Sequence, residues 1–322
     1  MNRRKFTLSL AASLLNLPLL PGAFASTDYP NKSAKIICPF APGGSGDISS
    51  RLFAEHFKAT TGQTLVVENR AGASGGIGAS AVKNTNPDGY TLMLSTQSII
   101  IANELFYKSL PYDPRDFVTV GLVGASCMFM LVNPAAPYKT IGEFIAYAKA
   151  NPETTTSAHF NTSSRIGAAI FASRADIRLS EIPYKDVGQA AVDLIAGRLS
   201  VIFLDTVASA QHIQSGSLKP LAITSGERNK IYPDVPSLSE TFPDTEILAF
   251  LSVSVAKEVP LEIQEKLNML VNGMTRSPAM LPRLETLGLT LRQLDLGALA
   301  AFVEGERKRW NEYVKIAKIE RE

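Results

Sequence analysis

The residues with the clearest chemical potential lie in a proline- and glycine-rich loop between Pro39 and Asp47. The loop follows a short apolar run and leads into a helical pattern, whose first turn has unpaired N–H groups and a positive dipole end. Gly43, Gly44 and Gly46 let another group approach the main chain closely. These features predict an anion site that needs no arginine, although a plain strand-to-helix turn fits the pattern equally well.

Asp47, at the end of this loop, has two possible roles. It is placed to cap its own helix, or to accept a hydrogen bond from a ligand amine or hydroxyl. No lysine follows the glycines in the manner of the GxxxxGK[ST] motif, so the loop does not predict a site for a nucleotide phosphate.

A second run rich in hydroxyl groups covers residues 157–165 and precedes another helical pattern. It resembles a second anion site at a helix start, facing the first. The alternative is simple N-capping of that helix by Thr162 or Ser163.

A GxSxG pattern at residues 72–76 raises the alternative of a secreted serine hydrolase. Its nucleophile would be Ser74, and its base would be a downstream histidine, His159 or His212. However, residues 68–70 separate the preceding strand from the serine turn, whereas a nucleophile elbow needs the strand to run directly into it.

The spacing of the histidines and cysteines does not predict a metal or cofactor site. His56, His159 and His212 lie far apart, and Cys38 and Cys127 fit no CxxC pattern. We therefore expect no metal and no cofactor. The two cysteines either pair after export or are small buried thiols in strands.

The N-terminus has the pattern of a secretory signal peptide. Arg3, Arg4 and Lys5 precede an apolar stretch over residues 6–20, and a small-x-small site follows, with cleavage near Ala25. The stretch is too short for a spanning helix, so we expect a soluble periplasmic protein. The sequence leaves open whether export uses the general or the twin-arginine route.

The charge balance excludes a function that depends on strong bulk charge. The chain has 32 basic and 30 acidic residues, and the leader removes three basic ones, which leaves 29 basic and 30 acidic residues. A nearly neutral mature protein gives no support for nucleic-acid binding.

Short apolar runs alternate with helical patterns, which predicts an α/β protein with a parallel sheet covered by helices. Two longer strand-like stretches, residues 122–132 and 248–256, flank the middle block. The simplest organisation is a signal peptide at 1–25, lobe one at 26–124 plus 250–322, and lobe two at 125–249. The two crossings would form a hinge, and the cleft between the lobes would bind the ligand.

Two helix starts carry recognisable caps. Thr140 and Glu143 predict a capping box, and Asp295 predicts the start of a final helix that continues through Trp310.

Several segments in this order resemble the Bug receptors, the periplasmic solute receptors of tripartite tricarboxylate transporters. The resemblance covers nearly all of the mature chain. Its segments are residues 29–30, 39–47, 66–73, 87–92, 110–117, 183–185, 194–199, 221–225 and 233–236.

The resemblance implies a two-lobed type II periplasmic-binding-protein fold that closes around a small organic carboxylate. It implies a monomeric receptor, not an enzyme, that delivers the ligand to the membrane subunits of a tripartite transporter. In that family two facing loops hold a ligand carboxylate through backbone N–H groups and hydroxyls. Carried over, with positions after neighbouring strands added, the ligand-binding residues are Phe40, Ala41, Gly43, Gly44, Asp47, Thr96, Gln97, Ala158, His159, Thr162, Ser163 and Asp205.

The sequence departs from the family pattern in the lobe-two loop. His159 and Phe160 stand where the family usually has glycines, and Arg165 follows. One hypothesis is that Arg165 pairs with a second carboxylate of the ligand. The identity of the ligand, and the choice between transport and sensing, stay open at this point.

Overall fold

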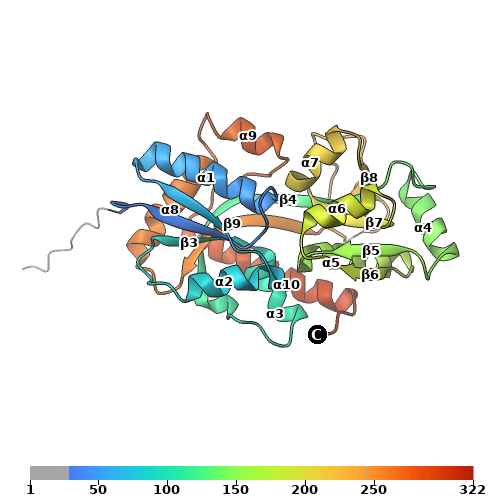
Figure 1. Ribbon diagram of the computed structural model, residues 1–322, viewed down its shortest axis with the longest axis horizontal. Helices are drawn as coiled ribbons and strands as arrows, with labels where there is room; N and C mark the ends of the chain where they lie inside the picture. The colour runs from blue at the N-terminus through green and yellow to red at the C-terminus, as the bar shows by residue number, and fades with distance from the viewer. Residues whose placement is uncertain (1–28, 244, 322) are drawn as a thin grey trace, which may run out of the picture.

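The computed structural model describes residues 29–243 and 245–321 (Figure 1). The predicted signal peptide at residues 1–25 lies outside the described residues. The described strands form a nine-stranded sheet in the order β2-β1-β3-β9-β4-β7-β5-β6, with β8 also paired to β4.

Two sets of parallel strands lie at opposite ends of this sheet. One set contains β1 (Ala34–Cys38), β2 (Leu65–Asn69) and β3 (Thr91–Thr96). The other contains β5 (Thr156–His159), β6 (Ser180–Pro183) and β7 (Val201–Asp205). We call the part built on the first set lobe one and the part built on the second set lobe two.

Two long antiparallel strands join the lobes, β4 (Phe117–Val132) and β9 (Leu248–Ala256). The first part of β4 pairs with β9, and its last part pairs with β7 and with β8 (Lys219–Ile223). Figure 1 shows both strands running through the middle of the molecule. The predicted lobe limits, 124/125 and 249/250, fall inside these strands and stay a prediction.

Helices cover both faces of the sheet. In lobe one they are α1 (Ser45–Thr61), α2 (Gly76–Lys83), α3 (Asn103–Phe106), α8 (Leu261–Met274), α9 (Leu281–Thr286) and α10 (Leu296–Ile316). In lobe two they are α4 (Ile141–Ala150), α5 (Thr162–Ala175), α6 (Val187–Ile195) and α7 (Thr206–Gln214). None of the helices in the described part of the chain is long and apolar enough to span a bilayer.

The predicted helix starts form, with one difference in detail. The Asp295 carboxylate accepts a hydrogen bond from the Ala298 N–H at 2.7 Å and begins α10. The Thr140 hydroxyl accepts from the Glu143 N–H at 3.2 Å, but the Glu143 carboxylate accepts from the Lys139 N–H instead of the Thr140 N–H. The predicted capping box is therefore only half formed.

The last helix, α10, also links the lobes. Trp310 is completely buried and packs edge-on against Phe106 of α3. At the end of the helix, the Ser173 hydroxyl of lobe two donates to the Ile316 carbonyl at 3.1 Å. The two lobes are thus joined by two strands and by one helix that lies along both.

The two cysteines do not pair. Cys38 in β1 and Cys127 in β4 are both free and buried, which confirms the prediction of two buried thiols in strands. Burial raises the pKa of each thiol to about 11, so both are neutral at physiological pH.

Candidate functional site

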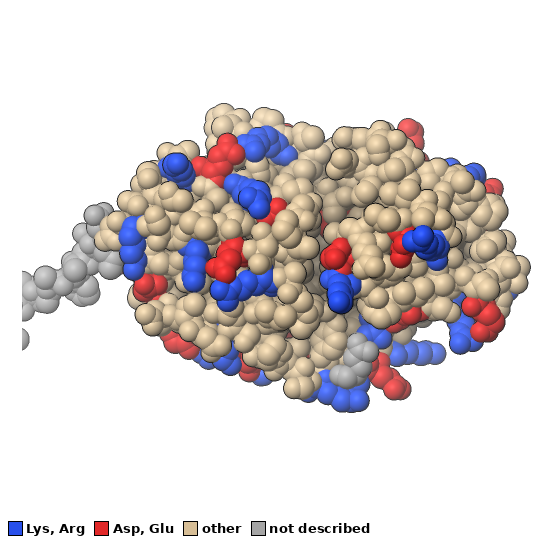
Figure 2. All heavy atoms as spheres, viewed as in Figure 1, with Lys and Arg blue, Asp and Glu red and all other residues tan. Residues whose placement is uncertain are grey.

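A cavity of about 100 Å³ lies between the lobes, at the carboxyl ends of the parallel strands of both sets. By the measure in which one water needs about 10–15 Å³, it has room for a small organic molecule. Figure 2 shows that the surface is hollowed between the two halves of the molecule. Its walls come from the loops after β1, β2 and β3 on one side and from the loops after β5, β6 and β7 on the other.

The loop after β1 supplies Phe40, Ala41, Gly44 and Ser45 to this cavity. Gly44 is the N-cap of α1 and makes no side-chain capping bond, so the helix start faces the cavity with backbone groups. Gly43, beside it, has a positive φ of 83°, a conformation that glycine adopts without strain. The glycine-rich loop therefore lines the cavity, and its role as an anion site stays a prediction.

The loop after β2 has an unusual backbone. Four successive residues, 72–75, have positive φ values, and two of them, Ala73 and Ser74, are not glycine. The strained turn is held from behind, because Asn103 Nδ2 donates to the Ser74 carbonyl at 3.0 Å and Tyr107 shares a hydrogen bond with the Ser74 hydroxyl at 2.8 Å. Strain of this kind is characteristic of functional loops.

The contacts of Ser74 differ from those that the alternative hydrolase needs. A serine nucleophile is activated by a hydrogen bond to a histidine, whereas the described partner of the Ser74 hydroxyl is the Tyr107 phenol. The His212 ring contacts Ser217, and His159 ends β5 beside Pro183 of β6. The described hydrogen bond of the Ser74 hydroxyl is therefore to a tyrosine and not to a histidine.

In lobe two, the loop after β5 supplies Phe160, Asn161, Ser163 and Ser164. Asn161 caps α5, since its side chain accepts from the Ser164 N–H at 2.9 Å and the Ser164 side chain accepts in turn from the Asn161 N–H. The sequence placed this cap at Thr162 or Ser163. The true cap lies one or two residues earlier, and the Ser163 hydroxyl instead contacts the Ser98 hydroxyl of lobe one at 3.0 Å.

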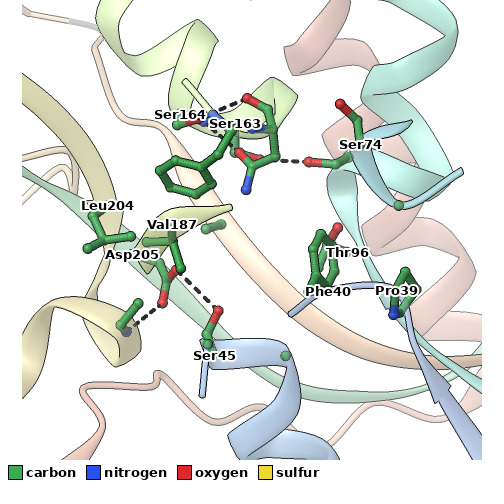
Figure 3. Close-up of a pocket in the computed structure, with 18 of the residues that line it drawn as sticks. Pro39, Phe40, Ser45, Ser74, Thr96, Ser163, Ser164, Val187, Leu204 and Asp205 are labelled. Atoms are coloured by element: carbon green, nitrogen blue, oxygen red, sulfur yellow. Dashed lines mark hydrogen bonds between the residues drawn. The ribbon is translucent and has the colours of Figure 1, made fainter. Parts of the chain in front are cut away.

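Hydrogen bonds connect the two walls directly. Gln97 Nε2 donates to the Ser163 hydroxyl at 2.6 Å, while Gln97 Oε1 accepts from the Phe250 N–H of β9 at 2.8 Å. The Ser45 hydroxyl donates to Asp205 Oδ2 at 3.2 Å (Figure 3). The loops after β1 and β5, predicted to face each other, therefore line one shared cavity.

Thr96 is the clearest unsatisfied group in the wall. It is the last residue of β3, it is only 9% exposed, and its hydroxyl oxygen is buried without a hydrogen-bond partner in the described structure. Buried polar atoms are almost always paired, so a lone one in a residue of the cavity wall is a candidate contact for a ligand that reaches it after a small side-chain movement.

The charged residues of the cavity wall are Lys185, Asp186 and Asp205. Lys185 is exposed and follows β6, and Asp186 caps α6 by accepting from the Gln189 N–H at 3.0 Å. Burial raises the pKa of Asp205, although the N–H groups of α7 and the Ser45 hydroxyl oppose this effect.

The predicted ligand-binding residues fall into two groups. Those in the cavity wall are Phe40, Ala41, Gly44, Thr96, Gln97, Ser163 and Asp205. Those outside the wall are Gly43, Asp47, Ala158, His159 and Thr162.

The residues of the second group whose contacts are described bind other residues of the protein. Asp47 binds Arg51 through paired contacts of 3.0 Å and accepts from the Gly43 N–H. Thr162 donates to Asn103 across the lobes at 3.3 Å, and Ala158 is buried within β5. Asp47 thus stabilises the loop after β1 from behind and does not line the cavity.

The structure corrects the hypothesis about Arg165. Its guanidinium contacts the Glu181 carboxylate at 2.8 Å and lies 5.7 Å from the centre of the Phe106 ring, outside the cavity wall. Arg165 is the fourth residue of α5, and the helix directs it away from the residues that line the cleft. It is not placed to receive a second ligand carboxylate.

Several wall residues were not named individually as ligand-binding: Ser45, Asn161 and Ser164 lie within the two predicted loops, whereas Ser74 and Val187 lie outside them. Val187 begins α6 directly after β6, the third parallel strand of lobe two. The signal that could have found it is the rule that ligands bind outside the carboxyl ends of the strands, applied to every strand of the set.

Comparisons with known proteins agree with this architecture. A family model described as "Tripartite tricarboxylate transporter family receptor" matches residues 49–319. The chain is 32% identical to the protein BugT of Bordetella pertussis over 287 residues, 88% of this chain and 88% of that one.

Solved structures give the same result. The structure of Rpa4515 with adipate, from R. palustris, has a TM-score of 0.88 and 27% identity and covers 92% of this chain and 100% of that one. MatC from Rhodopseudomonas palustris with bound malate has a TM-score of 0.83 and 27% identity, and the match covers 89% of this chain and 100% of that one. The chain therefore belongs to the tripartite tricarboxylate transporter family receptors, the Bug receptors, and has the two-lobed α/β fold of periplasmic binding proteins.

Proposed function

We propose that this protein is a periplasmic receptor that captures a small organic carboxylate by lobe closure and delivers it to a tripartite transporter. The observation that carries the proposal is the unpartnered Thr96 hydroxyl, buried in the wall of a cavity that both lobes line. The same cavity is lined by Ser74, Ser163 and the first residues of α1. Such donors bind a carboxylate without any catalytic group.

The energetics are sufficient for a receptor of useful affinity. A hydrogen bond to a charged group contributes about 1.5–3 kcal/mol net, and a micromolar complex needs roughly 8 kcal/mol. Three or four donors on preorganised loops supply much of that amount. The hydrogen bonds that hold the Ser74 loop and the start of α5 from behind support such preorganisation.

The ligands named for relatives support the same class of molecule. One similar structure carries adipate and another carries malate, both small dicarboxylic acids. The cavity of about 100 Å³ is compatible with ligands of that size. We extend the class, a small organic carboxylate, to this chain and leave the individual compound to experiment.

The mechanism that we propose is hinge closure. A ligand that touches both walls stabilises the closed arrangement through its higher affinity for that state. The bends would lie in β4 and β9, near the predicted limits of the lobes, and the closed form would be the one that the membrane subunits recognise. In this account the protein acts as a monomer outside the cytoplasm, after loss of its leader, and catalyses no reaction.

The binding step is tested by a thermal-shift screen with di- and tricarboxylates, amino acids, aromatic acids and nicotinate-like compounds. A ligand that binds only the native state raises the apparent melting temperature. We expect a carboxylate to do so, and Thr96→Val to weaken the shift. Thr286→Val is the matched control, because the Thr286 hydroxyl donates to the Pro282 carbonyl within α9, outside the cavity.

If no carboxylate shifts the melting temperature, or if both threonine variants behave alike, the binding site is misplaced. Delivery is a separate step and needs a separate assay. Uptake of the identified ligand into vesicles containing the transporter subunits should depend on added receptor, and a receptor that binds but does not stimulate uptake would refute delivery.

A further inference from the structure

The wall of the cavity carries an acidic group where a receptor for carboxylates would be expected to avoid one. Asp205 is the last residue of β7 and the N-cap of α7, and it is half-buried in the wall. Of the other charged residues that line the cavity, Asp186 already caps α6 and Lys185 is exposed. No basic side chain of the described structure forms a salt bridge with Asp205.

The carboxylate of Asp205 is fixed in position but retains acceptor capacity. Its Oδ1 accepts from the Ala208 N–H at 3.1 Å, and its Oδ2 accepts from the Ser45 hydroxyl of the opposite lobe at 3.2 Å. Each carboxylate oxygen has two acceptor positions. Figure 3 shows the Asp205 carboxylate beside Val187 and facing Ser45 across the cavity.

The charge of Asp205 favours a donor group over a second anion at this place in the cavity. Val187, Leu204 and Phe160 line the same cavity, together with polar residues such as Asn161 and Lys185, and the carboxylate itself contacts the Ser45 hydroxyl. A second carboxylate placed near Asp205 would meet a like charge in a partly dry site, with no cation paired to either group. A donor group placed there would instead meet a fixed acceptor.

We propose that Asp205 is a specificity-determining residue that accepts a hydrogen bond from an ammonium or hydroxyl group of the ligand. The favoured ligands are then carboxylates that carry such a donor, and an ammonium is preferred over a hydroxyl because its charge is opposite to that of Asp205. This inference rests on the proposed function, since it concerns the same cleft. Burial raises the pKa of Asp205, which agrees with a carboxylate that lacks a cationic partner until ligand arrives.

The test is calorimetric titration of the full mature chain with matched acids that differ only in one group. Glutamate, 2-hydroxyglutarate and glutarate form one set, and aspartate, malate and succinate form a shorter one. In at least one set we expect the donor-bearing acids to bind at least about tenfold more tightly than the unsubstituted diacid. A tenfold change in affinity is about the contribution of one hydrogen bond to a charged group.

Asp205→Asn should remove that preference for the ammonium acid while it keeps the helix cap, because Asn caps as well as Asp. Asp295→Asn is the matched control, since Asp295 caps α10 outside the cavity, and it should keep the ranking of the wild type. If Asp205→Asn fails to fold, the wild-type ranking still decides the question.

Two results would overturn the inference. One is an unsubstituted diacid that binds as tightly as its amino and hydroxy relatives, and the other is an unchanged ranking in Asp205→Asn. Both leave the proposed function intact, because a carboxylate still binds. If no carboxylate of these sets or of the wider screen binds at all, the proposed function itself fails.

Discussion

At the scale of single residues, Gln97 connects the two walls of the cavity. Its amide joins three parts of the fold, the end of β3, the strand β9 through the Phe250 N–H, and the start of α5 through Ser163. The side chain is only 2% exposed, so each contact is made away from bulk water. Gln97 therefore connects β9 to both walls of the cleft.

We predict that Gln97→Ala destabilises the protein by about 1–3 kcal/mol, because it leaves the buried Phe250 N–H without an acceptor. Urea unfolding monitored by circular dichroism measures this change. Gln293→Ala is the control, since Gln293 is exposed, and its effect should stay within about 0.5 kcal/mol. Equal midpoints for both variants would show that the Gln97 contacts contribute nothing to stability.

The thiols give a second prediction. Cys38 and Cys127 are buried, and burial raises the pKa of both to about 11, so neither presents a thiolate at neutral pH. Ellman's reagent should leave the native protein unlabelled and should titrate both thiols after unfolding in guanidinium. Rapid labelling of the native protein, or no labelling of the unfolded one, would contradict the free and buried state.

The residue scale is also where prediction from sequence was least accurate. Glycines and hydroxyls located both facing loops, but the exact wall residues depend on where β5 ends and α5 begins. Asn161 takes the cap, so Phe160, Ser163 and Ser164 face the cavity while His159 stays in the strand and Thr162 turns toward Asn103. A shift of one residue at such a junction decides which side chains face the cavity and which face away from it. No residue type in the sequence fixes that shift.

At the scale of elements, the packing of helix α8 on strand β4 shows how closely the lobe-one core is fitted. A Cβ atom added at Gly121 of β4 would lie 2.4 Å from the Val271 Cβ of α8. The absence of a side chain at this position lets the helix lie directly on the strand. The buried face of α8 carries Ile263, Leu267 and Val271 at the spacing of an amphipathic helix.

We expect Gly121→Ala to destabilise lobe one by about 1–3 kcal/mol through overpacking. Gly142→Ala is the matched control, because its added Cβ would meet nothing within 4 Å in α4. That substitution should be neutral or stabilising by up to about 1 kcal/mol, the difference in helix propensity between the two residues. Thermal unfolding of both variants measures the contrast, and a neutral Gly121→Ala would mean that α8 moves to accept the extra methyl.

Most elements were predictable because local rules decide them. The parallel strands, the helices that follow them and the caps at Thr140 and Asp295 were found from periodicity and cap residues. The pairing of β4 with β8 and the antiparallel place of β9 were not predicted, because strand order depends on contacts between residues far apart in sequence. The contacts by which α10 joins the two lobes were not predicted either, for the same reason.

At the scale of the whole molecule, the fold places two similar α/β lobes on a pair of shared strands. In the cleft the lobes touch through polar pairs such as Ser45 with Asp205 and Gln97 with Ser163, while one buried apolar cluster extends through both lobes. Polar contacts of this kind are exchanged for water at little cost, so the arrangement is suited to opening. The sequence predicted this organisation, since it showed two strand–helix series separated by two long apolar stretches.

We predict that small-angle X-ray scattering of the purified mature protein shows a smaller radius of gyration after addition of a tightly bound carboxylate. The physical reason is that a ligand bridging both walls favours the closed state. A non-binding amide analogue of the same acid serves as the control. A radius that stays constant while calorimetry shows bound ligand would exclude lobe closure as the response.

The most direct test of the account is a crystal structure of the complex with the carboxylate that gives the largest thermal shift. The account predicts a carboxylate oxygen within hydrogen-bonding distance, about 2.7–3.2 Å, of the Thr96 hydroxyl, between the loops after β1 and β5. A ligand bound elsewhere on the protein, or held in the cleft without any contact to backbone amides or hydroxyls of these loops, would contradict it.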